Sequence, residues 1–367
     1  MRIHIPDRAG RIRGAALGLV FALFVALALP CSAAEQPSTA STELGETPIL
    51  SAGPLEYRPG RGLRIDPLGL VIGGFTNIKA ETTDVAGGEF ALDNLNVFLI
   101  FDRFTRFRAV AELQMTDIFV ANKDHVGAQD FAFDVRRLFG DYTIADELTV
   151  RAGTFLTPVG YWNLILAPPL TWTTEAPVIV ERTFFQPTTT GLMAYGSTGV
   201  AGGQLGYSAF SQFLHPLESD PDLDPPDYTA GLRLTYDYGR AWALGATYQA
   251  AENDDQWSHL GAFDALWEHR RGQLLSELYV QDGGTLSSAQ WGTYLQGVFE
   301  VYGPLFLVGR YEYYDPPAPF RALNLFTIGA VLRPLPFMAV KVEYRFVDPA
   351  PEDDGLRGFF ASFTTFF

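Results

Sequence analysis

Residues 337–347 read Phe-Met-Ala-Val-Lys-Val-Glu-Tyr-Arg-Phe-Val, and their strict alternation indicates the fold. Successive side chains of a β-strand point to opposite faces. One face of this strand carries large apolar side chains: Met338, Val340, Val342, Tyr344 and Phe346. The other face carries charged side chains: Lys341, Glu343 and Arg345. A strand of this kind is typical of a barrel wall that faces lipid on one side and water on the other.

The same pattern recurs along the chain, in segments of about ten residues. We predict sixteen strands, at 68–79, 92–102, 106–116, 131–142, 147–156, 190–196, 203–213, 228–238, 241–251, 258–269, 273–281, 289–301, 305–314, 321–332, 337–347 and 357–367. The predicted fold class is therefore all-β, a transmembrane antiparallel β-barrel of about sixteen strands. A soluble β-sandwich or solenoid also alternates. Here, however, the polar face carries many charges of both signs and the other face is rich in aromatic residues, whereas a soluble sandwich would turn its polar face outward.

The connections between these segments alternate in length, which is an independent indication of a barrel with both ends in the periplasm. The short ones are the expected periplasmic turns: 103–105, 143–146, 197–202, 239–240, 270–272, 302–304 and 333–336. The longer ones are the expected outer loops: 80–91, 117–130, 157–189, 214–227 and 348–356.

The N-terminus predicts export across a membrane. Four arginines precede a continuous apolar run at 15–29, and small residues follow up to Ala34, which is typical of a signal peptide at 1–34. Cys31 follows Pro30, which disfavours a lipoprotein site, and cleavage near Ala34 would remove this only cysteine. We predict a flexible periplasmic leader at 35–66 and the barrel at 67–367.

Composition excludes several classes of protein. The formal net charge is −16, and removal of four arginines and Asp7 with the signal peptide brings it to −19, which argues against nucleic acid as a partner. No later window offers about 18 uninterrupted apolar residues, so helical membrane spans are not expected. The chain ends in Phe367, like barrels whose last aromatic residue is recognised by the barrel assembly machinery.

The third outer loop, 157–189, is the longest, and loops beyond about 12–15 residues are usually functional or disordered. It is too apolar to stand free in water, so we expect it to fold into the lumen with Trp162 and Trp172 against the wall. Its candidate pore-constriction residues are Trp162, Asn163, Trp172, Glu175, Glu181 and Arg182.

Residues 147–196 resemble the phosphate-selective porin O and P family. The resemblance lies in Arg-Ala-Gly-Thr-Phe-Leu-Thr-Pro-Val-Gly-Tyr-Trp-Asn at 151–163, in Pro168-Pro169-Leu170 and in Thr190-Gly191-Leu192. It implies a sixteen-stranded homotrimer whose third loop narrows the pore, with Gly153, Pro158 and Gly160 as the turn that sends the loop inward. The chain departs from that family in having only three lysines after the signal peptide and no N-terminal heptad pattern, so phosphate selectivity is not expected.

Alternation also predicts which charges face the lumen. The cationic set is Arg108, Arg136, Arg151, Arg233, Arg270, Arg310, Lys341 and Arg345. The anionic set is Glu112, Asp134, Asp237, Asp264, Glu277, Glu300, Glu312 and Glu343. These two sets balance, so we expect a weak field along the pore, with acidic outer loops that favour cations at low salt.

No catalytic residues, metal site or cofactor site are predicted. The histidines lack metal-ligand spacing, and Ser258-His259 is adjacent only in sequence. The aspartates at 220–227 leave divalent-cation binding open, with a solvated acidic loop as the favoured interpretation. We therefore expect an outer-membrane porin for passive diffusion of small hydrophilic solutes, surrounded by lipid and lipopolysaccharide. The alternative is a closed or plugged barrel that acts as a receptor, an adhesin or a structural protein.

Overall fold

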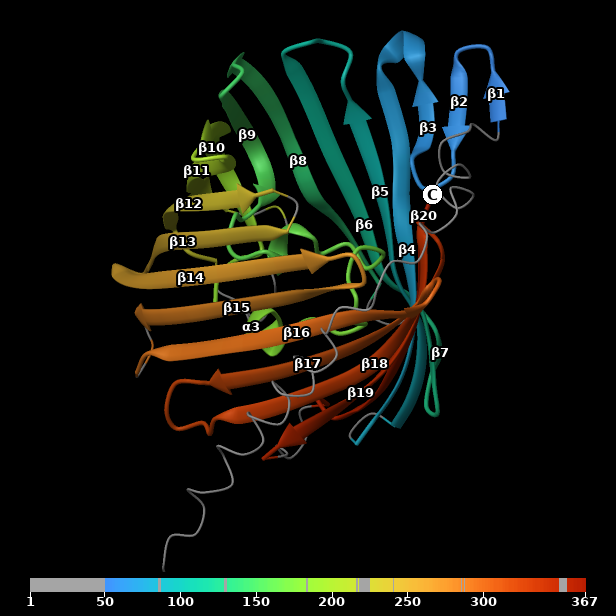
Figure 1. The fold of residues 1–367 in the computed structure, drawn as a ribbon, viewed down its shortest axis with the longest axis vertical. Coiled ribbons are helices and arrows are strands. Elements are labelled where there is room, and N and C mark those ends of the chain that lie inside the picture. Colours follow the sequence, from blue (N-terminus) through green and yellow to red (C-terminus); the bar gives the residue numbers. More distant parts are fainter. Residues whose placement is uncertain are drawn as a thin grey trace, which may run out of the picture. The chain divides into compact units, whose positions relative to one another are not determined.

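The computed structural model describes residues 50–367, except 85–86, 129–130, 183, 216, 218–224, 240, 285, 287 and 350–354. The predicted signal peptide, its cleavage site near Ala34 and residues 35–49 of the predicted leader lie outside this part of the chain. Nearly all regular structure in the described part is β-strand (Figure 1).

Sixteen antiparallel strands form the barrel wall, and they match the sixteen predicted segments one for one. They are β4 (Leu70–Thr83), β5 (Gly87–Phe101), β6 (Phe107–Asn122), β8 (Ala132–Ala145), β9 (Leu148–Leu156), β10 (Thr188–Val200), β11 (Gly203–Leu214), β12 (Tyr228–Tyr238), β13 (Trp242–Asn253), β14 (Gln256–His269), β15 (Gly272–Gly283), β16 (Gln290–Tyr302), β17 (Leu305–Asp315), β18 (Leu323–Leu335), β19 (Met338–Asp348) and β20 (Gly358–Phe366). The predicted fold class is confirmed.

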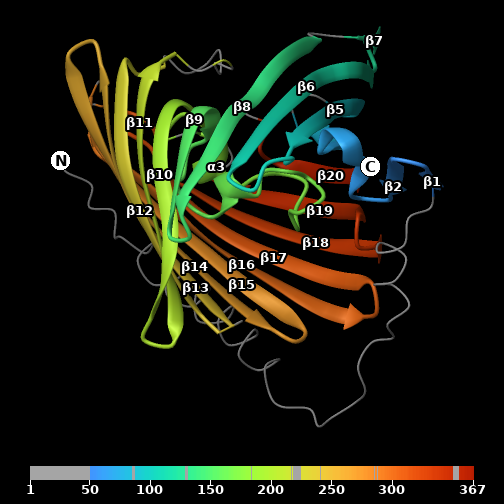
Figure 2. The same cartoon turned by 90° about the horizontal axis from the view of Figure 1, so that it is seen from above.

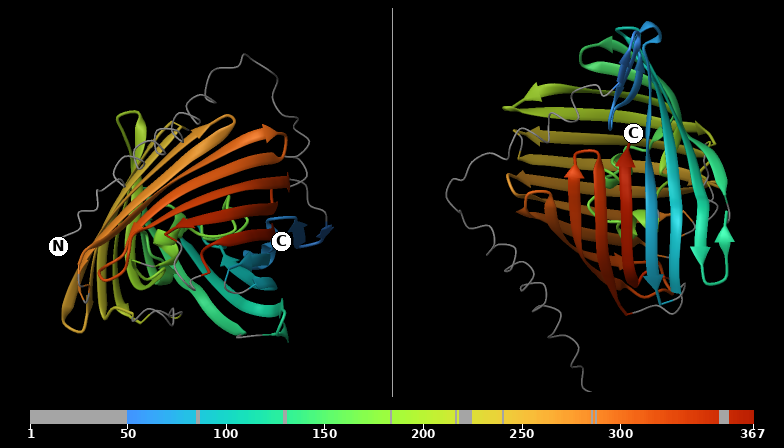
Figure 3. Two further views of the ribbon diagram at one scale, coloured as in Figure 1. Left: turned by 90° about the horizontal axis from the view of Figure 1, so that it is seen from below. Right: turned by 90° about the vertical axis from the view of Figure 1, so that its right-hand side faces the viewer.

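The last strand closes the ring against the first. β20 pairs with β4 from Gly358↔Thr83 to Phe366↔Phe75, and Figure 3 shows the two strands side by side. The backbone of Phe367 continues this ladder, since its N–H donates to the carbonyl of Gly74 at 3.0 Å. A side chain at Gly74 would collide with the Asn96 carbonyl of β5 and with the Phe367 ring, so this position needs a glycine. Closure leaves no free sheet edge along these strands.

The two faces of the wall differ as the alternation predicts. On β19, Val342 is 41% exposed on the outer face, whereas its neighbour Lys341 is 1% exposed on the inner face. Aromatic residues gather near both ends of the outer face. Trp242 and Trp267 pack at 6.0 Å near the short-turn end, and Trp291 and Tyr313 pack at 4.8 Å near the other end. Such aromatic girdles around an apolar band are typical of barrels that span a membrane.

Short turns join the strands at one end of the barrel, and both the start of β4 and the end of β20 lie there. The turns are 102–106, 146–147, 201–202, 239–241, 270–271, 303–304 and 336–337. At the other end the longest connections are 123–131, 157–187, 215–227 and 349–357. The predicted loop 80–91 is wrong in extent, because β4 and β5 pair as far as Thr83↔Gly87.

The predicted flexible leader is also wrong for its second part. Three short strands precede the barrel: β1 (Leu50–Ala52), β2 (Leu55–Arg58) and β3 (Gly62–Ile65). They pair in sequence, and β3 then pairs with Leu70–Ile72 of β4. The turns between them place Gly53 and Gly60 at φ of +61° and +74°, which glycine adopts without strain. Backbone pairing therefore orders a segment whose side chains show no periodicity.

Helices are few and short. They are η1 (Asp66–Leu68), η2 (Trp162–Leu164) and α3 (Val178–Glu181). In the described part of the chain, no helix is long and apolar enough to cross a membrane. The ring of strands encloses α3 and the coil beside it, as Figure 2 shows. This inner segment, residues 157–187 between β9 and β10, is called the inner loop below.

Candidate functional site

The inner loop leaves the wall through a tight turn after β9. Gly160 has φ of +64°, and a side chain there would collide with the Tyr279 hydroxyl and the Glu277 carboxylate. Pro158, which precedes it, is buried. Gly153, predicted as part of this turn, instead lies inside β9 opposite Gly191, with φ of +124° where a side chain would strike the Leu138 carbonyl. Only Pro158 and Gly160 of the predicted turn residues therefore lie where the loop departs.

The two ends of the inner loop are tied together at its base. The Asn163 amide donates to the carbonyls of Thr157 and Pro187, at 2.7 and 3.1 Å. The backbone N–H of Thr157 also donates to Pro187 at 2.9 Å. Asn163 is almost fully buried. Its role in the structure is to hold the loop closed at the point where it leaves the sheet.

Both tryptophans of the inner loop pack against the wall. Trp162 is buried edge-on against Tyr294 at 6.4 Å, and its backbone N–H donates to Glu277 at 2.7 Å. Trp172 packs on Phe306 at 4.9 Å and lies under the Arg333 guanidinium at 4.2 Å. Each tryptophan thus brings a large apolar surface to a wall position that also carries a charge.

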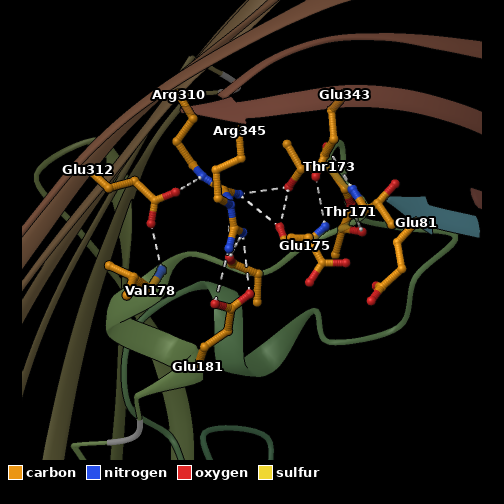
Figure 4. Close-up of polar contacts among 12 residues, drawn as sticks. Glu81, Thr171, Thr173, Glu175, Val178, Glu181, Arg310, Glu312, Glu343 and Arg345 are labelled. Carbon is orange, nitrogen blue, oxygen red and sulfur yellow. Dashed lines mark hydrogen bonds and ion pairs between the residues drawn. The ribbon is translucent and has the colours of Figure 1, made fainter. Parts of the chain in front are cut away.

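Inner-face charges of β15 and β17–β19 hold the backbone of the inner loop, and together they are called the loop wall: Glu277, Arg310, Glu312, Arg333, Lys341, Glu343 and Arg345. On β17, Arg310 pairs with Glu312 at 2.7 Å and donates to the carbonyls of Glu175 and Ala176. Glu312 in turn accepts the Val178 N–H at 2.6 Å (Figure 4). The first turn of α3 is therefore fixed by an ion pair of the wall.

Three residues at alternate positions on the inner face of β19 also hydrogen-bond to the inner loop. Lys341 donates to the carbonyls of Pro168 and Thr173 and to the Thr171 hydroxyl, at 2.7 to 3.0 Å. The Glu343 carboxylate accepts the N–H groups of residues 174 and 175. Arg345 donates to the Ala176 carbonyl and to both Glu181 oxygens (Figure 4). Cationic side chains of the wall donate hydrogen bonds to carbonyls of the loop, and anionic side chains accept them from N–H groups of the loop. These bonds satisfy buried backbone groups that have no hydrogen-bond partner in a neighbouring strand.

The two acids of the inner loop are in contrasting environments. Burial pushes the pKa of Glu175 up, but Lys79 at 2.8 Å, with Arg345 and Arg310, outweighs it and holds this pKa below its ordinary value. Burial raises the pKa of Glu181, and Arg345 at 3.3 Å only partly opposes the shift. Arg182 follows α3 directly and donates its backbone N–H to Val178.

A second set of inner-face charges lies on β6, β8, β9, β12 and β14, and these residues pair with one another instead of with the loop. They are called the arginine wall: Glu112, Arg137, Asp141, Arg151, Arg233 and Asp264. Arg151 donates two hydrogen bonds to the Asp141 carboxylate, at 2.7 and 2.9 Å, and Arg233 donates two to the Asp264 carboxylate, at 2.7 and 3.0 Å. Bidentate pairs of this kind fix the orientation of the guanidinium.

Arg137 joins the arginine wall through a β-bulge. Glu112 pairs with Arg137 whereas Leu113 pairs with Val135, so Arg136 is an extra residue in β8. Arg137 then binds Glu112, and Arg136 donates to Gln114 at 2.9 Å. Strict alternation points Arg136 inward and Arg137 outward, so Arg137 is not predicted as an inner-face charge. A bulge shifts the alternation by one residue, and no composition signal marks it here.

The remaining predicted positions fall as follows. Arg108 has the inward register, opposite Asp141, but lies exposed at the start of β6. Arg270 was predicted to point inward from a strand, but it lies in the turn after β14. Arg333 is predicted to lie in a turn, but it lies in a strand because β18 runs on to Leu335. Lys79 is not predicted as an inner-face charge, although it bridges Glu81 and Glu175.

Between the base of the inner loop and the arginine wall lies a cavity of about 370 Å³. Its lining combines three arginines with aromatic and aliphatic side chains: Arg137, Arg151, Arg233, Phe139, Tyr195, Met193, Leu156, Pro158 and Leu164, among others. Within the described ranges, no group of three or more acids, histidines or cysteines could hold a metal ion. Arg137 and Arg151 of the arginine wall thus keep 24% and 19% of their side chains exposed, whereas Arg310, Lys341 and Arg345 of the loop wall are buried under the inner loop.

Comparison with known proteins gives the fold its context. No family model and no curated protein match the chain. Among solved structures, OmpF of Salmonella typhi in complex with daunomycin has a TM-score of 0.60 at 12% identity, covering 81% of this chain and 97% of that one. The chain has the fold of a porin.

Two further structures support this porin fold. The anion-selective porin from Comamonas acidovorans gives a TM-score of 0.55 at 14% identity, over 81% of this chain and 99% of that one. OmpT, an outer-membrane protein of Vibrio cholerae, gives 0.56 at 9% identity, over 87% of this chain and 100% of that one. The narrower resemblance to the phosphate-selective family is not supported by a family match and stays a prediction.

Proposed function

We propose that this porin-fold barrel lies in the outer membrane and lets small hydrophilic solutes diffuse through its lumen. The observation that carries the proposal is the contrast between the two faces of a closed sixteen-stranded wall. The outer face is apolar with aromatic girdles, and the inner face carries charges. Sixteen strands enclose a lumen wide enough for water, whereas eight would leave only a packed core.

The inner loop is proposed to form the constriction of the pore. It lies inside the barrel and is hydrogen-bonded to charged side chains of the loop wall. The proposed constriction residues that belong to it are Trp162, Asn163, Trp172, Glu175, Glu181 and Arg182. Its acids are offset by Lys79 and Arg345. The charges of the arginine wall are paired, and the loop-wall charges without an ion pair in the described contacts are two cations, Arg333 and Lys341, and two anions, Glu277 and Glu343. Because these charges balance, we propose a weak field along the pore and weak selectivity, with no saturable site for inorganic phosphate.

The surroundings follow from the same location. Lipid and lipopolysaccharide cover the outer face, and Phe367, whose backbone closes the ring, is proposed as the residue recognised by the barrel assembly machinery. One solved OmpT of Vibrio cholerae is described as a trimer form, which supports a homotrimer here as a proposal. The N-terminal signal peptide is proposed to be cleaved near Ala34. We propose no enzymatic activity and no cofactor.

The alternative function, a closed barrel acting as a receptor, an adhesin or a structural protein, is favoured by one observation. The inner loop is bonded so extensively to the loop wall that it resembles a plug. Liposome swelling separates the two functions, because a porin admits small sugars at rates that fall with solute size. Proteoliposomes with correctly folded protein that admit none of these sugars would favour the closed barrel.

A further inference from the structure

The cavity along the arginine wall has the composition of a binding site and not only of a water path. Its volume of about 370 Å³ lies within the range of small-molecule pockets. Most such pockets are lined by apolar and aromatic groups with a few fixed polar groups. Here the apolar part comes from both sides, since Leu164 of the inner loop, which is 41% exposed, and Phe139 and Met193 of the wall all line the cavity.

The polar part consists of arginine guanidinium groups, each of which pairs with a more deeply buried carboxylate. Arg137 has 24% of its side chain exposed, whereas its partner Glu112 has 2%. Arg151 has 19% exposed and its partner Asp141 has 7%. The carboxylates are therefore the buried members of these pairs. A solute in the cavity meets the arginines first.

The arginines retain donors on the side that faces the cavity. Arg151 uses Nε and Nη2 to bind Asp141, and among the described contacts its Nη1 has no acceptor. Arg137 binds Glu112 through Nε, which leaves both of its Nη groups without an acceptor in the described contacts. The Arg151 guanidinium also lies over the Phe139 ring at 3.8 Å and the Tyr195 ring at 5.1 Å. Stacking and pairing fix its plane, so its free edge is preorganised for a planar anion.

We propose that this cavity binds small aromatic carboxylates as they pass through the pore. The carboxylate accepts hydrogen bonds from Arg137 and Arg151, and the ring lies against Phe139, Met193 and Leu164. Because each arginine already has an acid partner, the site is close to neutral and binding is weak. Weak binding suits a channel, since a solute must leave as readily as it enters. The proposal rests on the porin function, because the lumen is the route to the cavity.

The test uses the mature protein in planar bilayers, with single-channel current in potassium chloride titrated with three probes. Benzoate carries both the ring and the charge, benzyl alcohol carries the ring alone, and inorganic phosphate carries the charge alone. We expect benzoate to reduce the current saturably, at a concentration about tenfold below any effect of the other two, which corresponds to about 1.4 kcal/mol. Phosphate or benzyl alcohol acting as strongly as benzoate would overturn the proposal, as would no effect of benzoate on open channels.

Variants locate the effect at the cavity. The double substitution Arg151→Met with Asp141→Asn removes the pair without leaving a buried charge, and we expect it to weaken the benzoate effect about tenfold or more. Arg137→Gln with Glu112→Gln is a second, independent version in case the first does not fold. Arg64→Gln is the matched control, since Arg64 pairs with Asp66 and Asp102 and does not line the cavity. Unchanged benzoate titrations in a folded double variant would contradict the proposal.

Failure of the site and failure of the porin function give different results. If the barrel opens no channels, the diffusion function fails, and benzoate binding is then measured by saturation-transfer NMR on the folded protein in detergent. Binding that is lost in the double variant but kept in the control would support the site even so. If benzoate does not bind to the folded protein in this NMR experiment, the proposed site is wrong whether or not the barrel opens channels.

Discussion

The two inner walls carry similar charges but use them differently. On the loop wall, Arg310, Lys341 and Arg345 are almost fully buried, and their partners are carbonyls and acids of the inner loop. On the arginine wall, Arg137 and Arg151 pair with acids of the adjacent strands and keep 24% and 19% of their side chains exposed. Charge in the first wall therefore holds a segment of chain in place. Arginines of the second wall line the cavity beside the inner loop.

Removing the inner loop should produce the largest change in conductance, because it exposes the charged side chains of the loop wall to the lumen. A deletion of about residues 165–180 is expected to raise single-channel conductance about twofold or more, since the narrowest part of a pore dominates its resistance. Heat-modifiable mobility on gels checks that the deletion protein has folded. Equal conductance in a folded deletion protein would move the constriction away from the inner loop.

Substitution of one arginine in each wall should separate their energetic roles. Arg310→Met leaves Glu312 buried without its cation and frees two loop carbonyls, so we expect a loss of about 3–5 kcal/mol in the free energy of unfolding. Arg151→Met also leaves a buried acid, Asp141, without its cation, but it frees no loop carbonyl, and the shorter side chain opens Asp141 to the adjacent cavity. We therefore expect a smaller loss, of about 1–3 kcal/mol.

The measurement is guanidinium-induced unfolding in lipid, followed by tryptophan fluorescence. Trp162 and Trp172 report directly on the inner loop, because both pack against its wall. If the two variants lose the same stability, the distinction between the walls is unsupported.

The outer face offers a control for both inner walls. Val342 alternates with Lys341 and Glu343 on β19 and points outward. Val342→Lys should cost about 2–4 kcal/mol in lipid, because a lysine near the membrane midplane is poorly solvated. Thr235→Lys, on the inner face beside the cavity, should cost much less. Comparable losses at both positions in the same unfolding assay would argue against a lipid-facing outer surface.

The sequence predicted the wall better than what the wall encloses. Side-chain alternation and turn composition are local properties, and every predicted strand exists. Arg137 was missed because a bulge changes the register without changing the composition. The strands β1–β3 were missed because backbone pairing holds them rather than an apolar face. The partners of Lys341 and Arg345 come from about 165 to 175 residues away, and no local pattern can specify such contacts.

The smallest expected effect concerns the two acids of the inner loop. The pKa of Glu175 is held below its ordinary 4.5, so its ionised form adds stability that is lost as the pH falls. The pKa of Glu181 is raised, so its ionised form opposes folding as the pH rises through that value. At neutral pH, Glu175→Gln should lower the free energy of unfolding, whereas Glu181→Gln should leave it unchanged or raise it slightly. Unfolding curves at neutral and mildly acidic pH check the sign, and a reversed order would contradict the assigned pairing with Lys79.

Cysteine accessibility tests the central claim, that solutes pass along the arginine wall and not along the loop wall. The only native cysteine, Cys31, precedes the barrel, so single cysteines can be placed on a cysteine-free wall. Thr235→Cys and Ser208→Cys line the cavity, and Thr327→Cys lies buried on the inner face of β18. A charged thiol reagent added to open channels should reduce the current stepwise through the first two variants and leave the third unchanged. Modification at Thr327→Cys with none at the cavity positions would contradict the account.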